Sequence, residues 1–194
     1  NKNGYLVCFN HPYWSLQPQS DYFGLKGLFA METYNTGCYE FSGHSFYDYG
    51  LLAEFNQSIA PVASDDNHNH FRDPDLDHSD SFGGYTMIYT GDFSYTGIIK
   101  ALEEQQFYAS TGIDFEEISV ENGVVHVECT PSTSISIAFG GKRWDERLCY
   151  DREPLTSADF TIPWGARYIR VYCVNRRTGA NATTKAFAIP KDAE

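Results

Sequence analysis

Two side chains that commonly bind metal ions occur two residues apart in the stretch SDDNHNH, residues 64–70. In an extended segment residues i and i+2 point the same way, so Asp66 and His68 could hold one ion while Asp65 faces elsewhere. A carboxylate with imidazoles suits Zn, Mn or Fe, and an open coordination position would acidify a water molecule for hydrolysis. The same stretch also fits a solvated turn, because Asp, Asn and Ser dominate loops through local hydrogen bonds.

Polar residues also follow two earlier apolar runs. His11 follows the run YLVCF, and Glu32 and Asn35 follow GLFAM. Because the carboxyl ends of parallel strands open on the same side of a sheet, we expect these residues to meet Asp66 and His68 at one cleft. His11 would then be a third metal ligand, although the same residue could simply end a strand.

The candidate catalytic residues of this cleft are Glu32, Asn35 and His44, and their roles stay open. Glu32 could be a metal ligand, a group that orients His11, or a salt-bridged carboxylate at the rim. Asn35 could bind substrate or form a turn. His44, in FSGHSF, would lie over the cleft and act as an acid or as a phosphate ligand. No role is expected for the other histidines, which are His70, His78 and His126.

The pattern of the chain changes near Gly112. Before it, short continuous apolar runs alternate with two helical patterns, within 47–58 and 95–107, which is typical of a mostly parallel α/β sheet. The apolar residues expected to share one face of the first helix are Leu51, Leu52 and Phe55, and those of the second are Ile98, Ile99 and Leu102. We therefore predict an α/β domain over residues 1–112.

After Gly112 apolar residues alternate with a period of two, which indicates antiparallel strands. The alternating residues are Val125, Val127, Cys129; Ile135, Ile137, Phe139; and Ile169, Val171, Cys173. Asn122-Gly123 is a strong signal for a hairpin turn between the first two strands. The sequence therefore predicts a small antiparallel β-sandwich over residues 113–194.

The net charge restricts the classes of partner. The chain has 26 Asp and Glu against 14 Lys and Arg, a formal charge of −12 that opposes binding to nucleic acid or to an anionic membrane. It contains no apolar run long enough for a membrane span. The five cysteines lack metal-binding spacing, and we expect reduced core residues in a cytoplasmic protein.

Four stretches together resemble the PHP family, the polymerase and histidinol phosphatase superfamily of metal-dependent phosphoesterases. They are NHPYW at 10–14, METYN at 31–35, VASDDNHN at 62–69 and GIIKALEEQQFYASTG at 97–112. The resemblance covers residues 5–112 and implies the C-terminal part of a distorted (β/α) barrel, followed by a β-sandwich.

The resemblance also implies an activity and a set of site residues. His11, Asp66 and His68 would be metal ligands, and Glu32 and Asn35 would line the cleft. The implied cofactors are divalent Zn, Mn or Fe ions. The implied reaction is hydrolysis of a small-molecule phosphate ester by metal-activated water.

One departure from the family pattern affects each of these expectations. Family members open with an H-x-H motif on the first strand, and no such motif precedes His11 here, so the expected site is incomplete and could lack its metals. A partial barrel also leaves an unpaired sheet edge. A missing N-terminal segment or a second copy in a homo-oligomer could cover that edge. Alternatives are a noncatalytic module that binds a small molecule or a partner, and a hydrolase of a non-phosphate bond.

Overall fold

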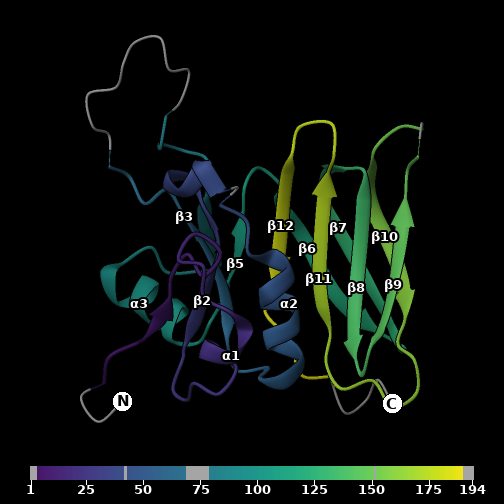
Figure 1. Cartoon of the computed structure of the whole chain (residues 1–194). Helices are drawn as coiled ribbons and strands as arrows, with labels where there is room; N and C mark the ends of the chain where they lie inside the picture. The colour runs from purple at the N-terminus through teal and green to yellow at the C-terminus, as the bar shows by residue number, and fades with distance from the viewer. Residues whose placement is uncertain (1–3, 42, 69–78, 151, 190–194) are drawn as a thin grey trace. The chain divides into compact units, whose positions relative to one another are not determined.

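The structure is a computed structural model that describes residues 4–41, 43–68, 79–150 and 152–189. The chain divides into two compact units, Asn1–Thr111 and Gly112–Glu194 (Figure 1). This division lies one residue before the boundary expected from the sequence.

The first unit combines a parallel sheet with an antiparallel strand pair and short helices. The sheet has the order β1-β2-β3, and both of its strand pairs are parallel. The elements of this unit are β1 (Cys8–Phe9), α1 (Gln19–Tyr22), β2 (Ala30–Asn35), the 3-10 segment η1 (Thr36–Phe41), α2 (Phe46–Phe55), β3 (Ala60–Ser64), β4 (Tyr85–Ile88), α3 (Tyr95–Glu103) and β5 (Phe107–Ser110).

The core of the first unit lies between α2 and the parallel sheet. Tyr49, Leu52 and Ala53 of α2 are buried, and they share a core with Met31 of β2 and Ile59. These helix positions follow the i, i+3, i+4 spacing of one helix face. The prediction that Phe55 belongs to this face is wrong.

The Phe55 ring is 71% exposed and instead contacts Phe23, at a centroid distance of 5.2 Å. The second helix is confirmed as an element, but only Ala101 of α3 is fully buried. The apolar residues predicted to form its buried face are partly exposed; they are Ile98, Ile99 and Leu102.

Strand β4 runs against the direction expected from its apolar sequence. It pairs with β5 in an antiparallel register, from Tyr85 opposite Ser110 to Ile88 opposite Phe107. Its Thr86 hydroxyl donates to the carbonyl of Ala63 in β3 and accepts from the Ala63 N–H. A continuous apolar run is compatible with either strand direction, so the direction of β4 could not be predicted from its sequence.

The run YLVCF was expected to be a buried strand, and this prediction is wrong for most of it. Only Cys8 and Phe9 pair with β2. The side chains before them are exposed, at 72% for Tyr5 and 52% for Leu6. Strand β1 is the edge of the sheet, so its apolar residues have one neighbouring strand rather than two.

The predicted fold class, an α/β fold with part of a (β/α) barrel, is also wrong. The structure is 42% strand and 15% helix, and no sheet formed by the described residues closes into a barrel. In the first unit a helix separates β2 from β3, but β4 and β5 form an antiparallel pair. None of the described helices is long and apolar enough to cross a membrane.

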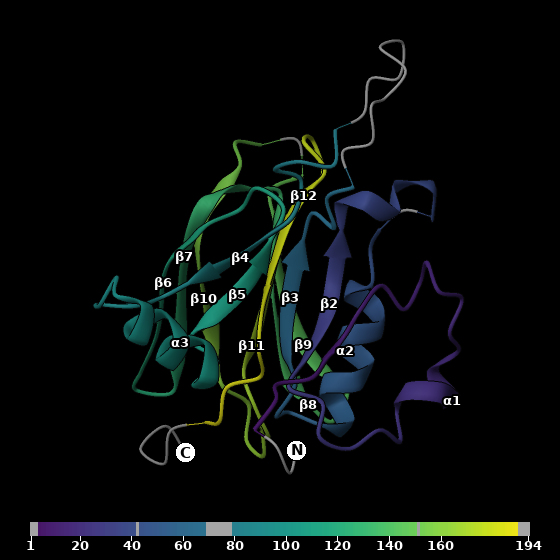
Figure 2. The same ribbon diagram turned by 90° about the vertical axis from the view of Figure 1, so that its left-hand side faces the viewer.

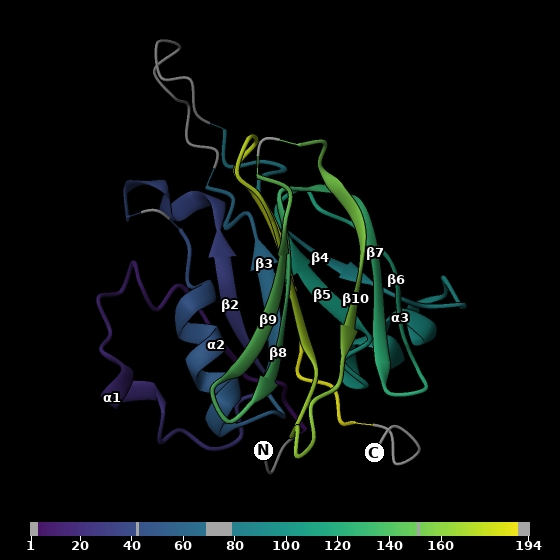
Figure 3. The same ribbon diagram turned by 90° about the vertical axis from the view of Figure 1, so that its right-hand side faces the viewer.

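The second unit is a β-sandwich, as predicted. One sheet has the order β10-β7-β6, and the other contains the neighbouring strands β12-β11-β8-β9 (Figures 1 and 3). Its strands are β6 (Phe115–Glu121), β7 (Val124–Ser132), β8 (Ser134–Gly140), β9 (Arg143–Leu148), β10 (Leu155–Thr161), β11 (Arg170–Asn175) and β12 (Ala180–Thr184).

The alternation predicted for this sandwich is confirmed. All nine residues of the three alternating sets are at most 2% exposed and fill the space between the sheets. The predicted turn between β6 and β7 is also confirmed. Asn122 and Gly123 both have positive φ, 49° and 74°, and Glu121 pairs with Val124 across the turn.

Candidate functional site

The candidate site lies at the carboxyl edge of the parallel sheet, where β2 and β3 end on the same side (Figure 2). His11 follows β1, Asn35 is the last residue of β2, and Asp66 follows β3 by two residues. The parallel direction of the strands therefore brings together polar residues that are widely separated in the sequence.

Glu32 connects all three strands of this edge. Its carboxylate is 4% exposed and accepts hydrogen bonds from the backbone N–H of His11 (2.7 Å), the side-chain amide of Asn35 (3.0 Å) and the hydroxyl of Ser64. Three donors compensate the burial of the carboxylate. Of the roles considered for Glu32, this geometry favours the one that positions His11.

A bulge in β2 places Glu32 and Asn35 side by side. Residues three apart in a regular strand point to opposite faces. The register with β3 shifts between Glu32, opposite Val62, and Tyr34, opposite Ala63, so Thr33 is an extra residue. Bulges redirect side chains in this way and often lie next to functional sites.

Asn35 links Glu32 to the loop after β3. Its side-chain amide donates to Glu32 and, over 3.1 Å, to Oδ2 of Asp66. Its Oδ1 accepts from the backbone N–H of Cys38 at 3.0 Å. Asn35 is 1% exposed, and these bonds fix the orientation of its amide.

Asp66 and His68 form the accessible part of the site. Oδ1 of Asp66 lies 4.0 Å from Nδ1 of His68, and the two side chains are 38% and 56% exposed. Both can therefore reach a ligand from solvent. The sequence predicted that this pair acts together, and the structure does place the two side chains close to each other.

Asp65 faces away from this pair and anchors the loop instead. It accepts hydrogen bonds from the backbone N–H groups of Phe82, Gly83 and Gly84 and from the hydroxyl of Thr36. Burial alone would raise the pKa of Asp65, but these four donors outweigh it and lower the pKa. Asp65 thus has a positioning role for the residue that follows it.

No family model, no curated protein and no solved structure matches this chain. The chemistry of the site is therefore inferred from its own residues.

The chemistry of the donor set fits a divalent transition metal only in part. Asp66, His68 and His11 supply the carboxylate and imidazoles that such ions prefer. Among residues 4–41, 43–68, 79–150 and 152–189, however, no three His, Cys, Asp or Glu side chains lie close enough to hold one ion. His11 reaches the cluster through its backbone, while its ring Nδ1 lies 2.8 Å from the hydroxyl of Ser15.

His44 lies against aromatic rings. Its ring centroid is 4.7 Å from that of Tyr34 and 5.7 Å from that of Phe46. Although the residue keeps some exposure, desolvation of the ring lowers the pKa of His44. A neutral imidazole suits proton acceptance better than the expected roles of acid or phosphate ligand.

Cys38 is unsuited to nucleophilic chemistry. Burial, with the negative charges of Asp66 and Glu32, raises the pKa of its thiol to about 11. At neutral pH the group is therefore a protonated thiol rather than a reactive thiolate.

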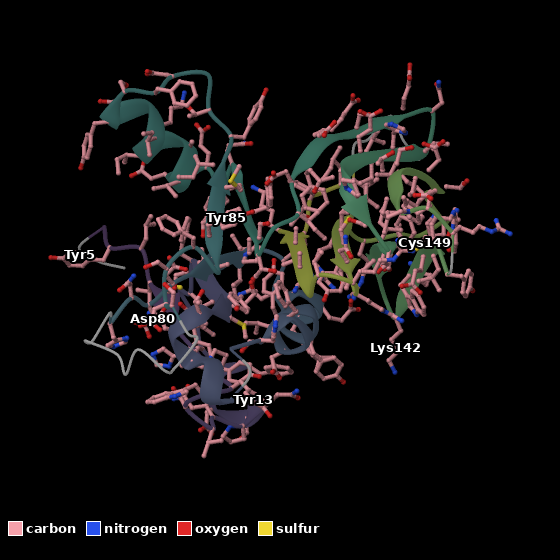
Figure 4. The ribbon with its side chains drawn as sticks, turned by 90° about the horizontal axis from the view of Figure 1, so that it is seen from above. Tyr5, Tyr13, Asp80, Tyr85, Lys142 and Cys149 are labelled. Atoms are coloured by element: carbon pink, nitrogen blue, oxygen red, sulfur yellow. The ribbon has the colours of Figure 1, made fainter. Side chains whose placement is uncertain are left out.

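Three residues that support the site were given no role from the sequence: Ser15, Ser64 and Asp80. Asp80, which is labelled in Figure 4, is 1% exposed. Its Oδ2 accepts from the backbone N–H of His68 at 3.2 Å. It follows His68 by 12 residues in a segment without periodic spacing, so no sequence signal connects the two. His70 and His78 lie outside the described residues.

Proposed function

We propose that the first unit carries a divalent-cation site, built around Asp66 and His68, that belongs to a metal-dependent phosphoester hydrolase. The observation that carries this proposal is the chain of hydrogen bonds from His11 through Glu32 and Asn35 to Asp66. It holds one candidate ligand in place while leaving it accessible beside an exposed imidazole. Hydrogen bonds that fix the orientation of a ligand side chain are typical of metal sites.

The distribution of charge also supports a cation rather than an anion as the first ligand. Asn1–Thr111 contains 4 Lys and Arg against 14 Asp and Glu, so this unit accounts for −10 of the total charge of −12. Such a field attracts divalent ions and repels a free phosphate ester. Binding of a phosphate ester would therefore depend on the cation.

The residues of the chain would contribute binding and orientation. Asp66 and His68 would hold the ion, and His11 would join them if its ring left Ser15. Asn35 and Glu32 would keep Asp66 oriented, and neutral His44 would accept a proton. A bound divalent cation would polarise a phosphoryl oxygen and lower the pKa of a water molecule.

The proposal is tested with the full chain and with Zn²⁺ and Mn²⁺ alone, by titration calorimetry. We expect binding that Asp66→Asn and His68→Gln each weaken by about tenfold or more, since each removes a ligand. Glu103→Gln is the matched control, because it removes one exposed negative charge of the same unit on α3. It should leave the affinity within about twofold.

Hydrolysis is measured on the metal-loaded chain with p-nitrophenyl phosphate. The expected result is turnover that Asp66→Asn abolishes and Glu103→Gln preserves. A chain that binds neither ion, and that hydrolyses no ester after incubation with them, would contradict the proposal.

A noncatalytic binding module is the second candidate. It is favoured because the polar groups of Asn35 and Glu32 already have hydrogen-bond partners within the protein. The amide and carbonyl groups of the Asn35 side chain and both oxygens of Glu32 are already bonded within the protein. Cation binding without turnover of any ester in a broad phosphate and carboxylate panel would favour this module. Turnover of carboxylic esters alone would indicate a hydrolase of a non-phosphate bond.

A further inference from the structure

The second unit contains two cysteines that face each other across the sandwich. Cys129 lies on β7 and Cys173 on β11, in opposite sheets and 44 residues apart. Their sulfur atoms are 3.9 Å apart, and the residues are 2% and 0% exposed. All five cysteines of the chain are free thiols in this structure.

The backbones that carry this pair are held on both sides. Strand β7 lies between β10 and β6, and β11 lies between β12 and β8. In register, Cys173 stands opposite Ile135 on one side and Ala182 on the other. Both cysteines therefore occupy central strands, where neighbouring strands keep the two sulfur atoms close.

A disulfide bond needs a sulfur separation of about 2.05 Å. The thiols must approach from 3.9 Å, a change that side-chain rotation and a small adjustment of the sheets can supply. Cys129 now makes a weak contact of 3.6 Å with the hydroxyl of Ser132, which the rotation would give up. The required movement is small compared with the spacing of about 10 Å between stacked sheets.

We propose that Cys129 and Cys173 are a redox modification site, at which a small-molecule disulfide such as oxidised glutathione converts the pair into a disulfide bond between the two sheets. One thiol loses its proton to solvent and attacks the small disulfide. This attack forms a mixed disulfide and releases one small thiolate. The second cysteine, also deprotonated, then attacks the protein sulfur of the mixed disulfide and releases the second small thiolate. The protein pair loses two electrons, and the small disulfide gains them.

The local contacts affect the two thiols differently in the folded sandwich. Cys173 donates its S–H to Cys129, and this hydrogen bond lowers the pKa of Cys129 against the opposing effect of burial. The same hydrogen bond and burial raise the pKa of Cys173. In the folded sandwich Cys129 is therefore the more readily deprotonated of the two thiols, and once the sheets open either cysteine can attack first.

Burial determines when the reaction proceeds. Because neither thiol is accessible in the folded sandwich, a small disulfide reaches either sulfur only when the sheets open. Oxidation should therefore be slow in the native state and fast during refolding. Once formed, the bond closes a loop of 44 residues and restricts the unfolded chain.

The test unfolds the full chain and refolds it in oxidised and reduced glutathione, followed by alkylation of free thiols and peptide mapping without reduction. We expect a peptide pair joined through Cys129 and Cys173, and a rise of about 10 °C in the Tm of the sandwich that reduction reverses. Incubation of the native protein with the same oxidant should give the same pair at least about tenfold more slowly.

Variants separate this pair from the other thiols. Cys129→Ser and Cys173→Ser should abolish the joined peptides and the Tm rise. Cys8→Ser is the matched control, because Cys8 is exposed on β1, and it should preserve both results. If a serine variant fails to fold, the peptide map of the unmodified chain still decides. Alkylation of both Cys129 and Cys173 after oxidative refolding, or joined peptides that mainly involve other cysteines, would overturn the proposal.

Discussion

Asn35 donates a hydrogen bond of 3.1 Å to the carboxylate of Asp66, which lies 31 residues later in the chain. The same amide group also donates to Glu32, so one neutral side chain lies between two carboxylates and is hydrogen-bonded to both. This arrangement orients Asp66 without neutralising it. An oriented anionic oxygen that remains open to solvent is what a cation site requires.

Replacement of Asn35 should therefore destabilise the first unit. Asn35→Leu keeps the branching at Cγ but removes the donors to both carboxylates and the acceptor for Cys38 N–H. We expect a loss of about 2 kcal/mol in the free energy of unfolding, measured by urea denaturation. Asn67→Ala, at an exposed position in the neighbouring loop, is the control and should change it by less than about 0.5 kcal/mol.

Asn35→Asp tests the electrostatic part of the same relationship. The variant places a third carboxylate beside Glu32 and Asp66, and like charges at this distance repel. It should be more destabilising than Asn35→Leu at pH 7, and this difference should shrink toward pH 4 as the introduced carboxylate, whose charged form is disfavoured by its neighbours, gains a proton. Equal stability of the two variants at both pH values would argue against a close group of charges.

Asp65 should make the first unit sensitive to acid. Because its pKa is lowered in the folded state, its contribution is fully present above the unfolded value of about 4 and is lost as the pH falls through the folded value. Asp65→Asn replaces one acceptor of backbone N–H groups with a donor, and we expect a loss of about 2 kcal/mol at pH 7.

The measurement for Asp65 is urea denaturation of the wild type and of Asp65→Asn between pH 3 and pH 7. Below pH 4 the two stability curves should converge. Curves that stay parallel over the whole range would show that ionisation of Asp65 does not stabilise the loop.

Gly37 should be intolerant of a side chain. A Cβ atom at this position would lie 2.7 Å from the carbonyl oxygen of Asp66 and 3.2 Å from that of Asp65. Gly37→Ala must therefore displace the backbone of the candidate site, and we expect a loss of about 2 kcal/mol. Gly24→Ala is the matched control, since a Cβ there meets no atom within 4 Å. Similar midpoints of urea denaturation for both variants would contradict this prediction.

His126 should make the second unit less stable as the pH rises. Its Nδ1 lies 2.6 Å from Oδ1 of Asp159 and its Nε2 lies 3.3 Å from Oε1 of Glu128, and these bonds raise its pKa. Glu117 and Glu121 line the same surface pocket. The stabilisation is fully present below the unfolded value of about 6.5 and is lost as the pH rises through the folded value.

The Tm of the sandwich should therefore fall between pH 6 and pH 9 by more in the wild type than in His126→Gln. High salt should reduce the difference, because the group is exposed and its charge interactions are screened. The prediction fails if the two proteins show the same dependence of Tm on pH at low salt.

The sequence alone determined the second unit well. Its apolar residues alternate with a period of two, and this pattern fixes which face of each strand is buried. Asn122-Gly123 fixed the position of the first turn, because both residues adopt positive φ at low cost. Both constraints are local, so they can be recognised in a single sequence.

The first unit depended more on tertiary structure. The run IAPVA gave the position of β3 and thereby placed Asp66 just beyond a strand end. The run GLFAM predicted a strand that ends before Glu32, whereas Glu32 lies inside β2, which continues to Asn35. The apolar runs did not give the antiparallel direction of β4, which is set by pairing with β5. The exposure of Phe55 likewise depends on which face of α2 meets the sheet.

At the candidate site, too, the sequence predicted some relationships and tertiary contacts decided the others. The spacing of Asp66 and His68 predicted neighbouring side chains on an extended segment; the side chains do lie close together, but Asp66 has a φ of 45° and is not extended. The sequence could not predict that Glu32 and Asn35 meet, because their spacing of three points them apart in a regular strand. The bulge at Thr33 brings them together, and it exists only in the register between β2 and β3. The contact of the Asp80 carboxylate with His68 was equally impossible to predict, because contacts between distant segments depend on packing and leave no local sequence pattern.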